Sequence, residues 1–349
     1  MNSISNETKL KANIQAIYIT YLYLSKKVIA KNGETLSVLC ERLEENRKAN
    51  RDKWSKREIK QLKQLKSAIE RMGYAANSKL QILAYLPSGM TACVFETRFG
   101  ELSFVFKGTG DGEWADNGEG LTGYESENTY ITYESMASSK FETSKTDYAT
   151  RSQAEAFNWF NCVLSFVSSP KKIIVSGHSK GGNKAQFITL HSPYVDECYS
   201  FNGQGFSPEA VKSFEKNLGP DFDKRRLKMH GICANDDYVS ALGKRIIPDE
   251  NMHFFESENG IHGIDAILNK TGALRDEVPK SRLSKYAESI SDEFLSLSPG
   301  FRKIAASPLM SMFEKYLGNG EPINMSNEEI IGAIAVSAKI LFKGLKNSN

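Results

Sequence analysis

The spacing of hydrophobic positions predicts helices over residues 1–78. Residues 59–69 carry isoleucine and leucine at roughly helical intervals, and the run SKRE just before them has the form of a capping box. The apolar, tyrosine-rich stretch 14–30 contains Gln15 and two adjacent lysines, so it is too short and too polar to span a bilayer. We therefore expect this stretch to be a buried core helix.

From residue 80 the pattern changes to short apolar runs of β type. Strands are predicted over 80–86, 92–98 and 102–107. Beyond residue 151 amphipathic segments alternate with apolar runs, which predicts helices at 151–167, 183–190 and from 208, and strands at 172–176, 197–201, 227–234 and 252–256. This alternation is typical of a mostly parallel sheet with helices on both faces.

Two regions depart from the alternation. Residues 108–150 are polar, rich in glycine, serine and threonine, and are predicted to be a loop, which at that length is usually functional or mobile. Beyond residue 281 we expect three helices, including a strongly apolar one over 330–345. The expected organisation is a helical N-terminal extension (1–78), an α/β core (79–280) and a C-terminal helical cap packed on the core (281–349).

Composition restricts the partners and the compartment. The net charge of +3 on 349 residues is too small to indicate a nucleic-acid partner. The five cysteines are scattered without a C-x-x-C pair, so we expect reduced, mostly buried thiols. The polar start, residues 1–11, lacks the pattern of a signal peptide. We expect a protein that is cytoplasmic as synthesised, with export by a specialised secretion system as the alternative.

Residues 177–182 carry the strongest chemical signal. Their sequence, GHSKGG, follows an apolar strand and precedes a helix, which is the setting of a nucleophile elbow around Ser179. Glycines flank the serine because the turn is tight and strained, and a side chain there would collide with it. The helix that begins at the turn directs its free N–H groups and its positive dipole end at the reacting centre.

A nucleophilic serine requires a base and an orienting acid. Four of the five histidines lie inside the elbow, on its helix or within predicted strands, namely His178, His191, His230 and His253. The fifth, His262, stands in a polar loop after the last strand, where doubly wound hydrolases place their base. Asp236 and Asp237 follow the strand 227–234, and either gives the chain order serine, acid, histidine.

Acyl transfer also requires donors for an oxyanion. One is expected from the backbone N–H of Lys180, the residue after the serine. The strand ending in Phe106 continues as Lys107-Gly108-Thr109-Gly110, where glycines allow close backbone approach, so the N–H of Thr109 is predicted to be the second donor. The alternative for these glycines is a simple turn.

These residues carry a family resemblance. The elbow, the sequence FKGT at 106–109, EWADN at 113–117 and FNGQGF at 201–206 together resemble a bacterial family of lipase-like α/β-hydrolases, catalogued largely as a domain of unknown function and related to the class 3 lipases. The similarity extends over about residues 80–275. It implies an α/β-hydrolase fold. In class 3 lipases the acid lies in a D-x-V setting, which Asp237 fits and Asp236 does not.

The sequence departs from the family in three respects. Lys107 replaces an arginine, and Lys180 replaces the leucine common after the nucleophile. Both changes leave the chemistry intact, because backbone groups do the work. Residues 1–78 match nothing in the family, which leaves the biological role open.

The expected function is serine-dependent hydrolysis of carboxylic esters, most readily of lipids, through a Ser179–Asp237–His262 triad and an acyl-enzyme. Gly108, Trp114 and His178 are predicted to contact the substrate, with the 108–150 region shaping the acyl site. This chemistry requires no cofactor and no metal. Alternatives are a thioesterase or acyltransferase, or a non-catalytic membrane- or protein-binding module on a hydrolase scaffold.

Two charged segments have competing interpretations. Residues 47–66 hold nine lysines and arginines beside Trp54 and an apolar stripe, which suits contact with an anionic membrane. The alternative is a solvated helix whose stripe packs on the core. Asp111, Glu113 and Asp116 lack the spacing of a calcium loop and are predicted to form a solvated acidic turn.

Overall fold

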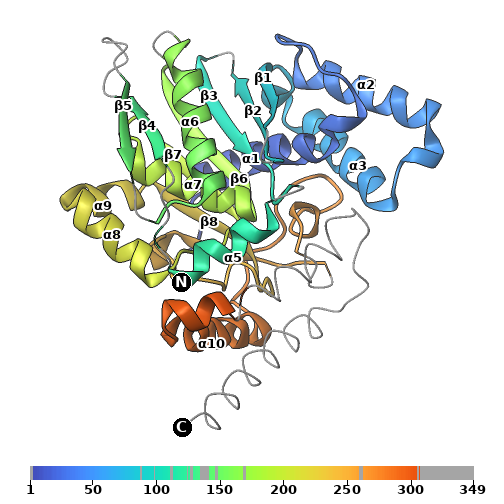
Figure 1. Cartoon of the computed structure of the whole chain (residues 1–349). Coiled ribbons are helices and arrows are strands. Elements are labelled where there is room, and N and C mark those ends of the chain that lie inside the picture. The colour runs from blue at the N-terminus through green and yellow to red at the C-terminus, as the bar shows by residue number, and fades with distance from the viewer. Residues whose placement is uncertain are drawn as a thin grey trace.

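A seven-stranded mixed sheet forms the centre of the computed structural model (Figure 1), in the order β1-β2-β3-β6-β7-β8-β9. The structure describes residues 3–86, 89–97, 99–110, 113–123, 125, 129–133, 141–145, 148–167, 170–258, 262–304 and 306. The strands are β1 (Lys79–Tyr85), β2 (Thr91–Glu96), β3 (Glu101–Phe106), β6 (Lys172–His178), β7 (Glu197–Phe201), β8 (Met229–Ala234) and β9 (Met252–Phe255).

The sheet is antiparallel at one edge and parallel elsewhere. β1, β2 and β3 pair antiparallel, and each step from β3 through β6, β7 and β8 to β9 is parallel. Because parallel strands share a direction, β3, β6, β7, β8 and β9 all end at the same edge of the sheet. The predicted α/β fold with a mostly parallel sheet is confirmed.

Helices cover both faces of the sheet (Figure 1). One face carries residues of α6 (Arg151–Ser165), α7 (Lys180–His191), α8 (Pro208–Leu218) and α9 (Pro220–Arg226) in a single hydrophobic cluster with the strands. The other face carries α1 (Asn6–Leu24), α2 (Leu36–Ala49), α3 (Lys56–Arg71) and the short α4 (Gly73–Ala76). Short 3-10 helices lie at Ser25–Lys27, Arg51–Lys53, Asp249–Asn251 and Ile264–Ala266.

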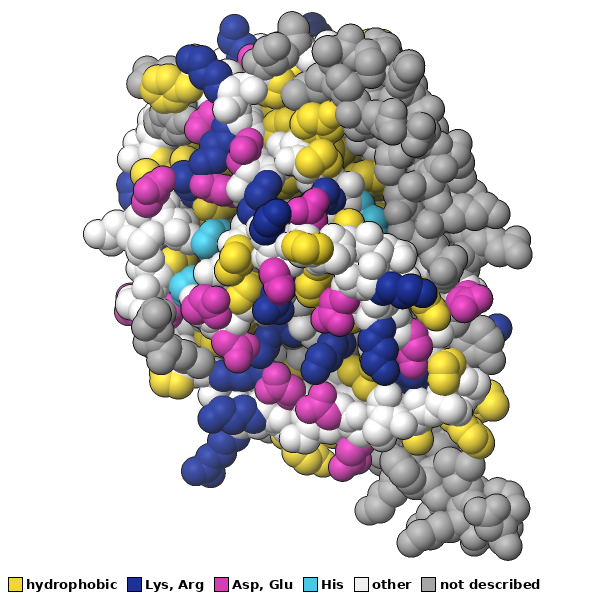
Figure 2. All heavy atoms as spheres, turned by 90° about the vertical axis from the view of Figure 1, so that its left-hand side faces the viewer, with side chains coloured by type: hydrophobic (Ala, Val, Ile, Leu, Met, Phe, Trp, Pro, Cys, Tyr) yellow, Lys and Arg dark blue, Asp and Glu magenta, His cyan; other side chains and the backbone are white. Residues whose placement is uncertain are grey.

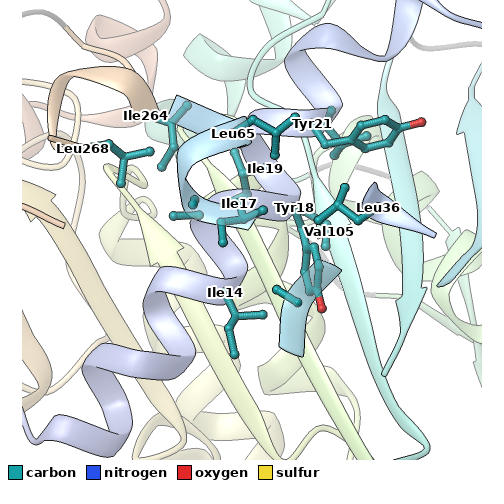
Figure 3. Packing of buried hydrophobic residues seen from close by; sticks show 14 of the residues in the cluster. Ile14, Ile17, Tyr18, Ile19, Tyr21, Leu36, Leu65, Val105, Ile264 and Leu268 are labelled. Carbon is teal, nitrogen blue, oxygen red and sulfur yellow. The ribbon is translucent and has the colours of Figure 1, made fainter. Parts of the chain in front are cut away.

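Helix α1 is the central helix of the second face. Its apolar residues point in all directions, which is typical of a helix buried on every side. Ile17 and Tyr18 pack among residues of α2, α3, β3 and the segment after β9 (Figure 3). Polar atoms on α1 also find partners in the sheet: Gln15 accepts a bond from Ser176 and donates one to Ser103. The prediction of a buried core helix over 14–30 is confirmed as far as Leu24, beyond which the chain forms the 3-10 helix Ser25–Lys27 and residues 28–30 are not helical. Residues of α1, α2, α3 and α4 share a hydrophobic cluster with the sheet.

The prediction of a loop over 108–150 was wrong in part. This region contains α5 (Trp114–Thr122) and a two-stranded sheet of β4 (Thr129–Tyr133) and β5 (Phe141–Lys145). The sequence of α5 is polar and glycine-rich, so it carries little helical signal. The helix is stabilised by ionic contacts with α7, which the sequence pattern does not reveal. Of the three helices expected after residue 281, the structure describes α10 (Arg282–Ser296) and helical residues 299–304, and the apolar segment 330–345 lies outside the described residues.

The surface beside α8 and α9 intersperses acidic and basic side chains, as Figure 2 shows. Among the described residues, no helix combines the length and apolar character that crossing a bilayer requires.

Candidate active site

The predicted site residues converge at the carboxyl edge of the parallel strands, where open α/β sheets bind their ligands. Ser179 directly follows β6, and Thr109 lies three residues after β3. Asp237 follows β8, and His262 lies in the segment after β9. The convergence follows from strand order, since four separate loops leave the sheet at one edge.

Ser179 has the strained backbone of a nucleophile elbow, with φ 58° and ψ −124°. Such a conformation costs on the order of 1–3 kcal/mol for a residue with a side chain, and the surrounding structure must hold it. The Ser179 N–H donates to the carbonyl of Phe201 at 2.8 Å, and the Ser179 carbonyl accepts the first bond of α7, from Asn183 at 3.1 Å.

The flanking glycines are sterically required. A Cβ on Gly177 would stand 2.3 Å from the carbonyl carbon of Gly181. A Cβ on Gly181 would stand 2.3 Å from the carbonyl oxygen of Phe106 at the end of β3. The elbow therefore lies directly against the strand that leads to Thr109.

Asp237 and His262 form a hydrogen-bonded pair, with Oδ1 of Asp237 2.6 Å from Nδ1 of His262. Asp237 is 1 % exposed, and its other oxygen accepts a bond from the N–H of Ser240 at 2.6 Å. The carboxylate of Asp236 is bonded to Ser257 instead. The sequence pattern allowed either aspartate as the acid, and the geometry distinguishes them: Asp237 is the one that contacts an imidazole and can orient it.

The outer nitrogen of His262, Nε2, is buried without a hydrogen-bond partner among the described residues. Ser179 and His262 therefore make no hydrogen bond here. Contacts of this kind are often long in the absence of substrate and tighten in the reacting complex. The His262 ring stacks on that of His178, the residue before the serine, with centroids 4.9 Å apart.

The segment after β3 lies beside the elbow. A Cβ on Gly108 would stand 3.2 Å from the carbonyl oxygen of His178. The hydroxyl of Thr109 accepts a bond from Asn117 on α5 at 2.9 Å, and the N–H of Gly110 donates to Glu113 at 2.7 Å. Two side chains of the EWADN run thus fix the loop that carries the predicted oxyanion donor.

Two buried ion pairs join α5 to the elbow helix. Nζ of Lys180 lies 2.7 Å from Asp116, and Lys184 contacts Glu113, with both lysines fully buried. Burial opposes ionisation of Asp116, but Lys180 and hydrogen bonds from Ser152 outweigh it and lower the pKa of Asp116 to about 2. Burial lowers the pKa of Lys184, against the opposing effect of Glu113.

The prediction of a solvated acidic turn was therefore wrong for Glu113 and Asp116, because both carboxylates have buried lysine partners. The spacing of these residues could have indicated the pairing. The two lysines are four residues apart and the two acids three, so the lysines share one helix face and the acids share another. Among the described residues, no cluster of three or more acids, histidines or cysteines forms a metal site.

A tyrosine of α1 reaches the site, and no pattern in the sequence predicts this contact. The hydroxyl of Tyr23 lies 2.7 Å from Nδ1 of His178, and Nζ of Lys107 lies 5.2 Å from the centre of the Tyr23 ring. Tyr23 is 155 positions from His178 in the chain, and helical periodicity alone does not say which edge of the sheet a helix end approaches.

Of the residues predicted to contact the substrate, the structure places Gly108 and His178 at the elbow but does not describe the side chain of Trp114. Gly108 and His178 adjoin the elbow, and His178 is 2 % exposed. Trp114 begins α5, but its side chain lies outside the described part of the chain, as do those of the other aromatic residues proposed for the acyl site, Tyr124, Tyr130, Tyr133 and Phe141. Their roles stay predictions.

The basic segment 47–66 covers the end of α2, the 3-10 helix Arg51–Lys53 and most of α3, which begins with the predicted capping box at Ser55 and Glu58. Its apolar stripe and Trp54 are buried against the core. Its basic face borders a groove of about 720 Å³ against the segment after His262, lined by Lys56, Ile59, Lys60, Lys63, Gln64, Lys66, Ser67, Glu258, Leu268, Asn269, Lys270 and Arg275.

The comparisons with known proteins place the elbow within a family match. A family model described as Mbeg1-like matches residues 139–225, which include β6, Ser179 and α7 but neither Asp237 nor His262. The match fits a lipase-like domain and, at a coarse level, a hydrolase. No curated protein matches the chain.

Proposed function

We propose that the protein is a serine-dependent carboxylic ester hydrolase acting on lipids. The observation that carries the proposal is a strained serine at the end of β6, with a hydrogen-bonded Asp237–His262 pair at the same edge of the sheet. The similarity of the elbow region to a lipase-like family supports the same reaction class.

In this proposal Ser179 Oγ attacks the ester carbonyl, and Nε2 of His262 takes the hydroxyl proton. Asp237 accepts the hydrogen bond from Nδ1–H, which sets the tautomer and stabilises the imidazolium that forms. The N–H groups of Lys180 and Thr109 bind the oxyanion. Collapse of the intermediate releases the alcohol with the proton from His262, and water then attacks the acyl-enzyme by the same route in reverse.

The groove beside α3 suits the presentation of lipid from an anionic membrane surface. Six of its lining residues are cations and one, Glu258, is an acid already paired with Lys60. Because the apolar stripe of α3 is buried, the contact we propose is electrostatic and involves no insertion into the bilayer.

The proposal is tested by hydrolysis of a panel of p-nitrophenyl esters, acyl thioesters and phospholipid vesicles, with Ser179→Ala in parallel. Hydrolysis of an ester by the wild type and its loss in the variant support the proposal. Preference for a thioester would move the enzyme to the thioesterase class. The absence of turnover on every substrate would favour a non-catalytic module.

A further inference from the structure

The N-terminal helix α1 contributes the side chain of Tyr23 to the site, where it contacts His178, the histidine that stacks on His262. Tyr23 lies near the C-terminal end of α1, and its hydroxyl is 2.7 Å from Nδ1 of His178. The same hydroxyl lies against the oxyanion loop, since a Cβ on Gly108 would stand 2.6 Å from it. The phenol therefore touches both the elbow and the loop that carries Thr109.

The direction of the Tyr23–His178 hydrogen bond depends on the tautomer of His178. Burial raises the pKa of Tyr23 to about 12, which keeps its proton in place at neutral pH. Nδ1 of His178 is the hydrogen-bond partner of the hydroxyl among the described residues. A phenol O–H that donates to Nδ1 makes Nδ1 the acceptor and leaves the ring proton of a neutral His178 on Nε2, which is buried without a hydrogen-bond partner among the described residues.

His178 in turn supports His262. The two rings stack with centroids 4.9 Å apart and planes 30° apart. Burial lowers the pKa of His178 well below its usual value, with smaller contributions from His262 and Arg57. Because His178 stays neutral, the imidazolium that His262 forms in the proposed reaction has no second positive charge in contact with it, and like-charge repulsion is avoided.

We propose that Tyr23 is a positioning residue of the active site, which acts by fixing His178 as its neutral Nε2–H tautomer and thereby holding the ring on which His262 rests. The proposal rests on the proposed ester hydrolysis for its kinetic consequence but not for its structural one. It assigns a role to the N-terminal helical segment: α1 fixes the elbow histidine as well as covering the sheet.

Other charged and ionisable groups also face this pair. They come from α3, the ends of β3 and β8, the start of α5 and the segment after β9: Arg57, Lys107, Asp237, Glu113, His262 and Asp265. Asp265 is held by Arg57 at 2.9 Å, so that pair adds little net charge. The Tyr23 hydroxyl is the group that contacts Nδ1 of His178 directly.

The test uses the full chain labelled with ¹⁵N-histidine, in wild-type, Tyr23→Phe and Tyr21→Phe forms. Tyr21 lies on the same helix and has a buried hydroxyl without a hydrogen-bond partner among the described residues, so its removal is a matched control. Long-range ¹H–¹⁵N spectra, assigned with His178→Asn, should show wild-type His178 as the Nε2–H tautomer at neutral pH. Tyr23→Phe should shift the Nδ1 resonance of His178 and the ring resonances of His262, and Tyr21→Phe should leave both in place.

Kinetics on the best ester of the panel add the functional consequence. Tyr23→Phe should lower kcat about tenfold, the effect of one lost hydrogen bond, with KM changed less than about twofold and Tyr21→Phe equal to the wild type. An Nδ1–H tautomer in the wild type, or spectra and kcat of Tyr23→Phe equal to those of Tyr21→Phe, would overturn the proposal. If no ester is hydrolysed by the wild type, the proposed function fails while the spectra still decide the positioning of His178.

Discussion

Oδ1 of Asp237 lies 2.6 Å from Nδ1 of His262, whereas the adjacent carboxylate of Asp236 is bonded to Ser257. Two neighbouring acids thus have separate partners. Asp237 is the one that contacts an imidazole, and Nε2 of that imidazole has no hydrogen-bond partner among the described residues. The proposed mechanism depends on this difference.

Asp237→Asn should lower kcat about 10⁴-fold, because an amide no longer fixes the tautomer that leaves Nε2 free to take a proton. Asp236→Asn is the matched control, since it changes the neighbouring residue by the same atoms, and its kcat should stay within a few fold of the wild type. Circular dichroism and the unfolding midpoint establish that both variants fold. A larger loss in Asp236→Asn than in Asp237→Asn would contradict the assignment of the acid.

Removal of one partner of a buried ion pair should destabilise the fold strongly. Lys184→Met leaves the carboxylate of Glu113 buried without its cation, which costs about 3–5 kcal/mol in comparable pairs. Adding Glu113→Gln removes the unpaired charge and keeps an acceptor for the Gly110 N–H, so the double variant should recover part of the loss. Urea unfolding of the wild type, Lys184→Met, Glu113→Gln and the double variant gives the coupling. An unchanged free energy of unfolding in Lys184→Met would show that the pair contributes nothing.

Asp116 predicts a specific loss of stability in acid. Its pKa is lowered to about 2 in the folded protein, so its contribution is present at pH values above its ordinary pKa and is lost as the pH falls from about 4 toward 2. Asp116→Asn should be less stable at neutral pH, and its difference from the wild type should shrink over that interval. Unfolding midpoints measured at a series of pH values provide the comparison. A difference that stays constant down to pH 2 would contradict the lowered pKa.

The basic groove predicts binding to anionic vesicles. Lys56, Lys63 and Lys66 line it and form no salt bridge within the described part of the chain, whereas Lys60 is paired with Glu258 and Asp265 and is left intact. Changing the three lysines to glutamate should reduce binding to anionic vesicles, each cation contributing about 1 kcal/mol near the surface, and should spare hydrolysis of a short water-soluble ester.

A control variant carries the same charge change elsewhere, at Lys171, Lys212 and Lys216, which are exposed and lie outside the groove. It should bind vesicles as the wild type does. Binding of the wild type should weaken as salt is added. Equal losses in both triple variants would attribute the effect to net charge and remove the groove from the account.

The sequence was most informative where local rules dominate. Glycines around Ser179, the capping box at Ser55 and the strand-and-helix alternation each follow from backbone sterics or periodicity within a few residues. The D-x-V setting also selected Asp237, which the structure pairs with His262, although the catalytic roles of both stay predictions.

The features that the sequence did not predict depend on contacts between distant segments. Lys180 and Lys184 would be expected on a solvated helix face, and their burial is tolerable only because Asp116 and Glu113 arrive from another helix. Tyr23 reaches His178 because α1 crosses the sheet in one particular direction, which hydrophobic spacing does not specify. α5 was predicted to be a loop because its glycines lower helix propensity, which its tertiary contacts override.

Activation of Ser179 is tested by labelling with a fluorophosphonate probe, in which an activated serine oxygen attacks phosphorus and displaces fluoride. The folded wild-type protein should be labelled on the peptide containing Ser179, as located by mass spectrometry. Urea-unfolded wild type and folded Ser179→Ala should both remain unlabelled. Labelling of Ser179→Ala equal to that of the wild type, or no labelling of the folded wild type, would contradict the assignment of Ser179 as an activated nucleophile.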